Sequence, residues 1–513
     1  MRVQTTRLVA ALEALEYPEA ANQVANWCDG HAELALIQDS REVAVEASGA
    51  LPVLFLATPG VATDGREHIE AALSAGAVGV LAEGDELAAR WQNEARVVSL
   101  PGITQQLAAL GRVLFDVPET LRVIGVTGTN GKSSVTHYIA ALLERLGHPA
   151  AVVGTLGYGR PDALRPALQT TPGPLALQQM LGEMAAEGVE TVAMEVSSHA
   201  LAQDRLGDTR VDTAVFTNLS RDHLDYHVSM AAYAAAKAKL FQRDGLRLAV
   251  VNGDDPLARL MLAGLPAGVR VLATGSNDAT TLRVAGCEAL PEGLRAVVAS
   301  PEDEHVLELP LMGRFNLDNA LLAMTTLYGL GHSLESIWPA AAELTPVPGR
   351  MQRVTAIDEA SGPAVIVDYA HTPAALDNAL AALREHLPGG DGSALWCIFG
   401  CGGDRDPGKR VPMAEAVERH ADRVVITDDN PRGESAEAIR DAVSGGLQSP
   451  ASAWSIGGRR DAIERVIAEA NDHDIVLIAG KGHEDYQEIA GVRQPFDDRE
   501  VARSALQRRG ALT

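Results

Sequence analysis

The chain has 513 residues, and 68 acidic side chains against 43 basic ones give it a formal net charge of −25. This acidic balance argues against a nucleic-acid or anionic-membrane partner, because such partners select basic surfaces. At about 150 residues per domain, the length favours three domains.

Short apolar, β-branched runs alternate with helix-length segments, which is typical of an α/β protein with a mostly parallel sheet. In the first part of the chain, strand signals lie at 51–57, 77–82 and 95–100. Later strands are predicted at 121–126, 190–196, 211–217, 247–252, 364–369, 394–400, 423–427 and 474–479. Breaks at 115–120 and 345–349 divide the chain into predicted domains 1–117, 118–345 and 346–513.

The N-terminal stretch lacks the apolar core of a signal peptide, since Glu13 and Glu16 interrupt it. The sequence also lacks a run of about 18 apolar residues that could span a membrane. Four cysteines are too few and too scattered for a disulfide scaffold, and we interpret them as reduced core thiols. They are Cys28, Cys287, Cys397 and Cys401. We therefore expect a cytoplasmic protein. A monomer is a separate expectation, which these observations do not support.

A glycine-rich loop follows the strand predicted at 121–126 and precedes a helix. It consists of Thr127, Gly128, Thr129, Asn130, Gly131, Lys132, Ser133 and Ser134. Glycines let successive amides face one anion, and the helix N-terminus adds its positive end. Lys132 can reach the β- and γ-phosphates of ATP, and the Ser133 hydroxyl can bind Mg²⁺. Val126 stands where the strict pattern has glycine, so the loop is a variant; the alternative is a chance glycine-rich turn.

A second glycine–lysine spacing at 403–409 lacks the required hydroxyl, because Arg410 stands in its place and Pro407 removes an amide donor. We interpret this segment as an anion or substrate loop, with Arg405 and Lys409, rather than as a second triphosphate site.

Polar residues follow two strands of the predicted central sheet. Glu195 ends the strand at 190–196, and His223 follows the strand at 211–217. Ligands bind beyond the carboxyl ends of parallel strands, which makes both residues candidate Mg²⁺ ligands, although Mg²⁺ prefers oxygen. Taken alone, each is more often an ordinary polar loop residue, but the position beside the glycine-rich loop favours the metal-ligand interpretation. Lys237 lies in an alanine-rich predicted helix, where the pattern alone indicates a solvated lysine.

Seven motifs occur in a fixed order: TGTNGKSS, EVSSHAL, NLSRDHLDYH, GRFNLDNALLA, DYAHTP, TDDNPRGE and AGKGHEDYQ. Together they resemble the Mur ligases, the ATP-dependent amino-acid-adding enzymes of peptidoglycan synthesis. The resemblance runs from about 120 to 490, and the first segment matches more loosely through Asp39-Ser40-Arg41 and residues 63–66. It implies a UDP-sugar-binding N-terminal domain, a central ATPase and a Rossmann-like C-terminal domain, with a role in cell-wall biogenesis, cell shape and cell division.

The resemblance also implies roles for single residues. Lys132, His223 and Lys237 would be catalytic, and Lys237 would be carbamoylated by CO₂. A carbamate supplies oxygens and a negative charge where an ammonium would repel Mg²⁺. The implied metal ligands are Ser133, Glu195, His223 and the Lys237 carbamate. Asn316, Asp368 and His371 would join the phosphate loop in binding ATP.

The implied substrates are ATP, UDP-MurNAc-L-Ala-D-Glu and meso-diaminopimelate. By resemblance, contacts to the muramoyl-dipeptide come from Ser40, Thr170, Thr171, Ser197, Gln203 and Arg205. Contacts to diaminopimelate come from Arg405, Asp429, Asn430, Pro431, Arg432, Gly480 and Glu484. A guanidinium can bind a distal carboxylate bidentately, which suits Arg432, and Glu484 would bind the distal ammonium. In isolation, Arg432 would be interpreted as a surface turn residue.

Two alternatives stay open. A folylpolyglutamate synthase shares the phosphate loop and acyl phosphate chemistry, but would not need residues 429–432 or a UDP-binding first segment. A P-loop regulatory protein would use ATP as a switch, and the polar motifs at several strand ends argue against it.

Overall fold

The computed structural model describes residues 1–60, 63–84, 87–91, 93–355, 362–388 and 392–510. The chain forms two compact units. The first comprises Met1–Thr129, Gly147–Ala249 and Arg259–Arg270, and the second comprises Asn130–Leu146, Val250–Ala258 and Val271–Thr513. The fold is α/β, as predicted, whereas the domain boundaries near 117 and 345 stay predictions.

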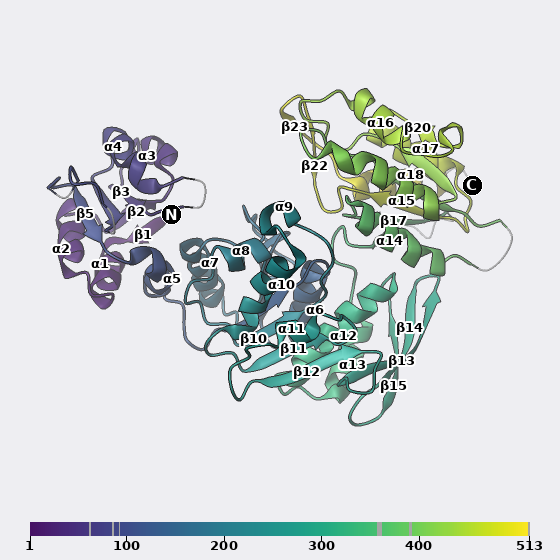
Figure 1. Cartoon of the computed structure of the whole chain (residues 1–513), viewed down its shortest axis with the longest axis horizontal. Coiled ribbons are helices and arrows are strands. Elements are labelled where there is room, and N and C mark those ends of the chain that lie inside the picture. The colour runs from purple at the N-terminus through teal and green to yellow at the C-terminus, as the bar shows by residue number, and fades with distance from the viewer. Residues whose placement is uncertain (61–62, 85–86, 92, 356–361, 389–391, 511–513) are drawn as a thin grey trace. The chain divides into compact units, whose positions relative to one another are not determined.

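The first unit begins with a five-stranded sheet (Figure 1). Its elements are β1 (Arg2–Gln4), α1 (Thr5–Ala14), α2 (Pro18–Trp27), β2 (Glu33–Ile37), α3 (Ser40–Ala47), β3 (Val53–Ala57), η1 (Gly65–His68), α4 (Ile69–Ser74), β4 (Gly79–Glu83), β5 (Val97–Leu100) and α5 (Ile103–Leu114). The strands are ordered β1-β2-β3-β4-β5, and only the β1–β2 pair is antiparallel. Both faces of β3 and β4 are buried, since one apolar cluster includes Leu8 and Leu107 and another includes Val43 and Ile69. The strands predicted at 51–57, 77–82 and 95–100 are confirmed as β3, β4 and β5.

The first unit also holds the strands around the phosphate loop. Its further elements are β6 (Arg122–Thr127), β7 (Ala150–Gly154), β8 (Gly157–Gly159), α7 (Pro174–Ala186), β9 (Thr191–Glu195), α8 (Ser198–Ala202), β10 (Thr213–Phe216), α9 (Leu224–His227), α10 (Met230–Ala238) and η2 (Lys239–Gln242). The order is β10-β6-β9-β7-β8, parallel except for β8. Glu195 pairs in register with Val126, and Phe216 pairs with Thr127. The carboxyl ends of three predicted strands therefore meet at one edge.

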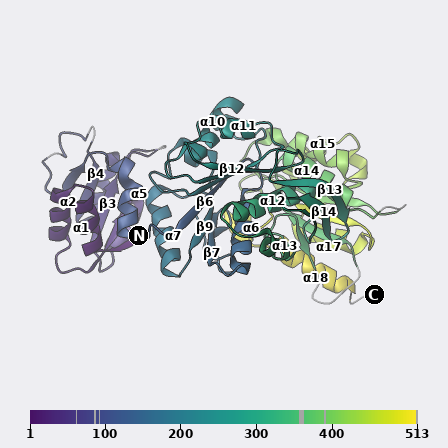
Figure 2. The ribbon, with the colours of Figure 1, turned by 90° about the horizontal axis from the view of Figure 1, so that it is seen from below.

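Two elements, β11 (Leu248–Asn252) and α11 (Ala258–Met261), lie partly in each unit, and the first residue of β12 (Arg270–Gly275) also belongs to the first unit. The second unit continues with α6 (Lys132–Arg145), β12 (Arg270–Gly275), β13 (Leu282–Leu290), β14 (Gly293–Ala299), β15 (Glu304–Leu309), α12 (Arg314–Gly329) and α13 (Leu334–Ala342). Helices α6 and α12 lie side by side in both views (Figure 1; Figure 2). Strands β13, β14 and β15 are antiparallel. Cys287 lies exposed on β13, so its interpretation as a core thiol is wrong, whereas Cys28, Cys397 and Cys401 are buried and free.

The C-terminal sheet is ordered β16-β17-β21-β18-β19-β20, parallel except for β16. The elements of this segment are β16 (Gln352–Val354), β17 (Ala364–Asp368), α14 (Pro373–Glu385), β18 (Leu395–Phe399), η3 (Pro407–Lys409), α15 (Arg410–His420), β19 (Arg423–Ile426), α16 (Ala436–Ser444), η4 (Pro450–Ser452), β20 (Trp454–Ser455), α17 (Arg459–Glu469), β21 (Ile475–Ala479), β22 (Tyr486–Ile489), β23 (Val492–Pro495) and α18 (Asp498–Gly510). Apolar clusters cover both faces. The four strands predicted between 364 and 479 are confirmed. Within the described ranges, every helix is too short or too polar to cross a bilayer.

Candidate active site

The phosphate loop lies between β6 and α6, as predicted. Gly128 has φ 154° and Gly131 has φ 84°, and α6 begins at Lys132. A Cβ atom on Gly128 would overlap the Thr217 hydroxyl, and one on Gly131 would overlap the Asn319 side chain. Both positions therefore require glycine, for conformation and for space. Glycines that a turn requires, followed at once by a helix N-terminus, are typical of an anion-binding loop and argue against a chance turn.

Lys237 is buried on α10, with 1% of its surface exposed, so the interpretation as a solvated helix lysine is wrong. Its Nζ donates a hydrogen bond to the Gly128 carbonyl oxygen (2.7 Å) and lies 4.6 Å from the ring centroid of Tyr233. The Tyr233 hydroxyl lies 3.1 Å from Thr129 Oγ1, and burial raises the pKa of Tyr233 to about 12. Sequence reasoning missed Tyr233, although a tyrosine four residues before a candidate lysine shares its helix face.

Glu195 is buried at the carboxyl end of β9. The backbone N–H of Thr155 donates to Glu195 Oε1 (2.9 Å), and the Thr155 hydroxyl donates to Oε2 (3.3 Å). A Cβ atom on Gly154 would overlap this carboxylate. The carboxylate is therefore fixed in orientation beside the strand that carries the phosphate loop.

His223 stands in the left-handed region (φ 52°) immediately before α9. Its ring centroid lies 4.8 Å from that of His199. The ring of His227 lies 5.4 Å from His199, and its Nε2 is 2.9 Å from Ser198 Oγ. Burial lowers the pKa of His199, and the neighbouring His223 and His227 add to the shift. Sequence reasoning missed His199 and His227, although both stand inside quoted motifs.

The residues predicted to contact the muramoyl-dipeptide form a hydrogen-bonded group, with Ser40 as the exception. The Thr171 hydroxyl donates to the Glu195 carbonyl oxygen (2.8 Å) and accepts from the Ser197 N–H (3.0 Å). Arg205 donates to Gln203 Oε1 (2.9 Å) and to the Thr171 carbonyl oxygen (3.2 Å). Thr170 lies 3.1 Å from Thr155, the residue that holds Glu195. Ser40 is the first residue of α3, which follows β2 near the N-terminus, and the Asp39 side chain caps that helix.

Asn316 is buried on α12, where its Nδ2 donates to the Met312 carbonyl oxygen (2.9 Å). Asn319, one helical turn later, donates to Asn316 Oδ1 (3.3 Å) and packs against Gly131. Asn316 is thereby connected to the phosphate loop through Asn319, which sequence reasoning left out. The signal was present, because two asparagines three residues apart share one helix face.

Asp368 ends β17 and accepts hydrogen bonds from the N–H groups of Met351 (2.7 Å) and Ala370 (2.8 Å). Burial raises the pKa of the Asp368 carboxyl. His371 Nδ1 lies 2.8 Å from the Tyr369 carbonyl oxygen, and Lys409 Nζ donates to the His371 carbonyl oxygen (3.2 Å). Lys409 comes from the segment interpreted as an anion loop, so that loop and the predicted nucleotide residue His371 are adjacent.

The residues predicted to bind diaminopimelate meet at the carboxyl edge of the C-terminal sheet. Arg432 has φ 51°, and its Nη1 donates to the Gly403 carbonyl oxygen (2.8 Å). A Cβ atom on Gly402 would lie 2.9 Å from Arg432 Nη1 and 4.0 Å from Arg405 Cγ, so both arginines border Gly402. Only 21% of the Arg432 side chain is exposed, which is low for a surface turn.

The rest of this group is joined around Asn430. Asn430 Nδ2 donates to Glu484 Oε2 (2.9 Å), and Lys481 Nζ donates to both residues. A Cβ atom on Gly480 (φ 117°) would lie 2.6 Å from Asp429 Oδ2. Pro431 is buried, and its carbonyl oxygen lies against Gly403. Sequence reasoning missed Lys481, although it directly follows a predicted strand and Gly480.

The predicted metal ligands are not arranged as a complete metal-binding site. Among the described residues, no group of three or more histidine, cysteine, aspartate or glutamate side chains is arranged to hold a metal ion. Glu195 is oriented by Thr155, and Lys237 faces the Gly128 carbonyl oxygen as an ammonium. An ammonium at Lys237 would repel a cation bound next to it.

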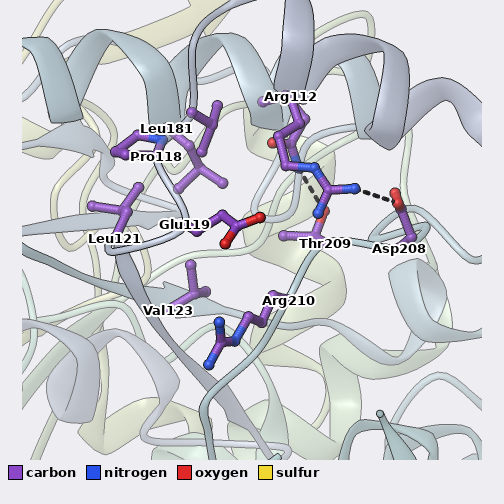
Figure 3. A pocket seen from close by; sticks show the side chains of 11 residues that line it. Arg112, Pro118, Glu119, Leu121, Val123, Leu181, Asp208, Thr209 and Arg210 are labelled. Carbon is purple, nitrogen blue, oxygen red and sulfur yellow. Dashed lines mark hydrogen bonds and ion pairs between the residues drawn. The ribbon is translucent and has the colours of Figure 1, made fainter. Parts of the chain in front are cut away.

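A separate pocket in the first unit contains none of the predicted site residues (Figure 3). Apolar side chains such as Leu121 and Leu181 form part of its lining. Both of its arginines form ion pairs, Arg112 with Asp208 (2.9 Å) and Arg210 with Asp212 (3.1 Å). We assign no role to this pocket.

Two family descriptions match the chain: the Mur ligase middle domain over residues 126–327, and the Mur ligase, glutamate ligase domain over residues 349–482. A protein of Pseudomonas syringae pv. tomato is 46% identical over 91% of this chain and 95% of its own length. A protein of Pseudomonas aeruginosa has the same identity and coverage. Both are named UDP-N-acetylmuramoyl-L-alanyl-D-glutamate–2,6-diaminopimelate ligase.

Solved structures give a matching result. A structure with that same ligase name is 37% identical, with a TM-score of 0.66 over 92% of this chain and 94% of that one. A MurF ligase from Thermotoga maritima in complex with ADP is 18% identical, with a TM-score of 0.61 over 93% of this chain and 98% of its own. A folylpolyglutamate synthase of Mycobacterium tuberculosis is 20% identical, with a TM-score of 0.59 over 73% of this chain and 92% of its own. The last two share the fold alone.

Proposed function

Because the chain belongs to the Mur ligase family, we propose that it joins 2,6-diaminopimelate to the D-glutamyl γ-carboxylate of UDP-N-acetylmuramoyl-L-alanyl-D-glutamate, with hydrolysis of ATP to ADP and phosphate. One observation carries the proposal: relatives named for this reaction are 46% identical over 91% of the chain. The folylpolyglutamate synthase alternative has support in the fold alone.

The chemistry follows from the weakness of a carboxylate as an electrophile. A γ-carboxylate oxygen attacks the γ-phosphorus of ATP, ADP leaves, and an acyl phosphate forms. The amine of diaminopimelate then attacks the acyl carbon, and phosphate leaves from the tetrahedral intermediate as the nitrogen loses a proton. Lys132 and the N-terminus of α6 would offset charge on the transferring phosphoryl group, so the protein contributes positioning and electrostatic stabilisation.

Mg²⁺ and a modified lysine belong to the same proposal. Lys237 is a buried cation against the phosphate loop, and the reaction of its neutral amine with CO₂ would release a proton and leave an anionic carbamate. Within the first unit, Glu195, His223 and this carbamate would supply oxygen ligands and one histidine nitrogen for Mg²⁺. Ser133 stays the predicted further ligand. When bound, Mg²⁺ would neutralise charge on the nucleotide phosphates.

The function is tested by measuring tripeptide formation and phosphate release with the UDP-linked dipeptide and ATP. We expect both products with meso-diaminopimelate and little of either with L-lysine. Phosphate release without the amine or the dipeptide would favour a regulatory ATPase instead. Activity with folate, glutamate and ATP would favour a folylpolyglutamate synthase.

The carbamate is tested with Lys237→Ala. We expect the variant to lose activity and to regain part of it when short carboxylates are added, since these can occupy the space of the carbamate. Full activity of Lys237→Ala without any addition would contradict the modification.

A further inference from the structure

Lys481 is a fully buried lysine at the start of the loop after β21, with none of its side chain exposed. A buried ammonium is costly unless it is paired and hydrogen-bonded. Its Nζ donates to Asn430 Oδ1 (3.1 Å) and to Glu484 Oε2 (3.0 Å), and it lies 5.3 Å from the ring centroid of Tyr486. The cation is therefore committed to two residues that the proposed function assigns to amino-acid binding.

These contacts determine which way the Asn430 amide points. Asn430 Oδ1 accepts from Lys481 and from the Glu488 backbone N–H (2.9 Å), so the oxygen already has two donors. Nδ2 uses one hydrogen for Glu484 Oε2 and has a second. If the amide were flipped, its NH₂ group would face the Lys481 ammonium and the Glu488 N–H. Both of these are donors, so neither could form a hydrogen bond with it. The orientation presents an N–H donor beside a carboxylate acceptor.

Glu484 is fixed by the same cation. Its Oε2 accepts from Lys481 and from Asn430, which leaves Oε1 as the acceptor that can bind an incoming ammonium. The Glu484 side chain is 20% exposed, whereas that of Lys481 is fully buried. An N–H donor and a carboxylate oxygen side by side match the carboxylate and ammonium of an amino acid.

We propose that Lys481 is a positioning residue, which fixes the polarity of the Asn430–Glu484 pair so that it binds the zwitterionic end of the amino-acid substrate. This inference rests on the proposed function for the assignment of Asn430 and Glu484 to that substrate. Lys481 acts through the two side chains that it holds, Asn430 and Glu484. Its loss allows the amide to turn over and the carboxylate to swing.

The test is steady-state kinetics of Lys481→Met in the full chain, with each of the three substrates varied in turn. We expect the KM for diaminopimelate to rise about tenfold or more, because hydrogen bonds to charged groups are among the strongest. The KM values for ATP and the UDP-linked dipeptide should stay within about twofold. Arg509→Met is the matched control: its guanidinium donates to the Ile467 carbonyl oxygen (2.6 Å) and to Asp472 (2.8 Å), away from the site residues.

The proposal is overturned if all three KM values stay unchanged or rise by the same factor. Lys481→Gln, which keeps an N–H donor without the charge, is measured in the same way if Lys481→Met does not fold. Failure of both variants to fold would assign the lysine a purely structural role and overturn the proposal. Wild type assayed with a panel of amino acids tests the proposed function separately, and the KM ratio for whichever amino acid it uses still tests Lys481.

Discussion

The side chain of Arg432 is already held in place before any ligand arrives, because Gly403 accepts its hydrogen bond and Glu488 lies 3.7 Å from its Nε. We expect Arg432→Ala to raise the KM for diaminopimelate by roughly 30- to 5,000-fold, since a lost charged contact costs about 2–5 kcal/mol. The KM of Arg432→Lys for diaminopimelate should lie between those of the wild type and Arg432→Ala, because an ammonium cannot bind a carboxylate bidentately. Kinetics at saturating ATP decide this, and an unchanged KM for diaminopimelate would refute the role.

Val228 is a strained residue in the loop between α9 and α10. It has φ 66° and ψ −37°, which is rare for a β-branched side chain, and it is 87% exposed. We expect Val228→Gly to stabilise the chain by about 1 kcal/mol, because relief of strain outweighs the greater freedom of glycine in the unfolded state. Urea unfolding measures the change. Val45→Gly, at an exposed position in α3, should instead destabilise by about 0.5 kcal/mol.

The Arg459–Asp498 ion pair joins the N-terminal ends of two helices. Arg459 begins α17 and Asp498 begins α18, and both side chains are completely buried. Arg459 also donates to the Ala479 carbonyl oxygen (2.9 Å), at the end of the strand that leads to Lys481. We expect Asp498→Asn to destabilise by about 3–5 kcal/mol, because it leaves a buried guanidinium without its countercharge.

An exposed ion pair on the same helix provides the control. Arg465 and Glu469 are four residues apart on α17, at 3.0 Å, with about half of each side chain exposed. Glu469→Gln should cost about 0.5 kcal/mol or less, since water screens such pairs. Denaturant midpoints of the two variants give the comparison, and equal shifts would contradict the assignment of the large cost to burial.

The sequence predicted those elements whose signal is local. The runs predicted at 121–126, 190–196 and 211–217 became the buried strands β6, β9 and β10. The phosphate loop lies between a strand and a helix, because glycine positions and strand ends are encoded within a few residues. The antiparallel strands β13, β14 and β15 were not predicted. Buried and exposed positions do not alternate regularly along them, so the period of two that marks a half-buried strand is weak.

The site was predictable where motifs marked it and not where distant segments meet. Asn319 on α12 contacts Gly131 at the start of α6, and Lys481 contacts Asn430, which is 51 residues away in the sequence. Such partnerships depend on packing between elements, which neither periodicity nor spacing contains. The pattern alone predicted a solvated Lys237 for the same reason: an alanine-rich helix gives no sign of which face is buried.

Nucleotide binding should increase the free energy of unfolding of the chain. A ligand that binds only the folded state at about 100 times its Kd adds about 2.7 kcal/mol. We expect ADP with Mg²⁺ to raise the Tm of the wild type, and Lys132→Ala to abolish that rise while changing the unliganded Tm little. Lys132 is the first residue of α6, the helix end that we propose binds the phosphates. Arg145→Ala, at the opposite end of α6, removes an ion pair with Glu343 and should keep the full ADP effect. An equal rise in Tm for Lys132→Ala would show that the glycine-rich loop does not bind the nucleotide.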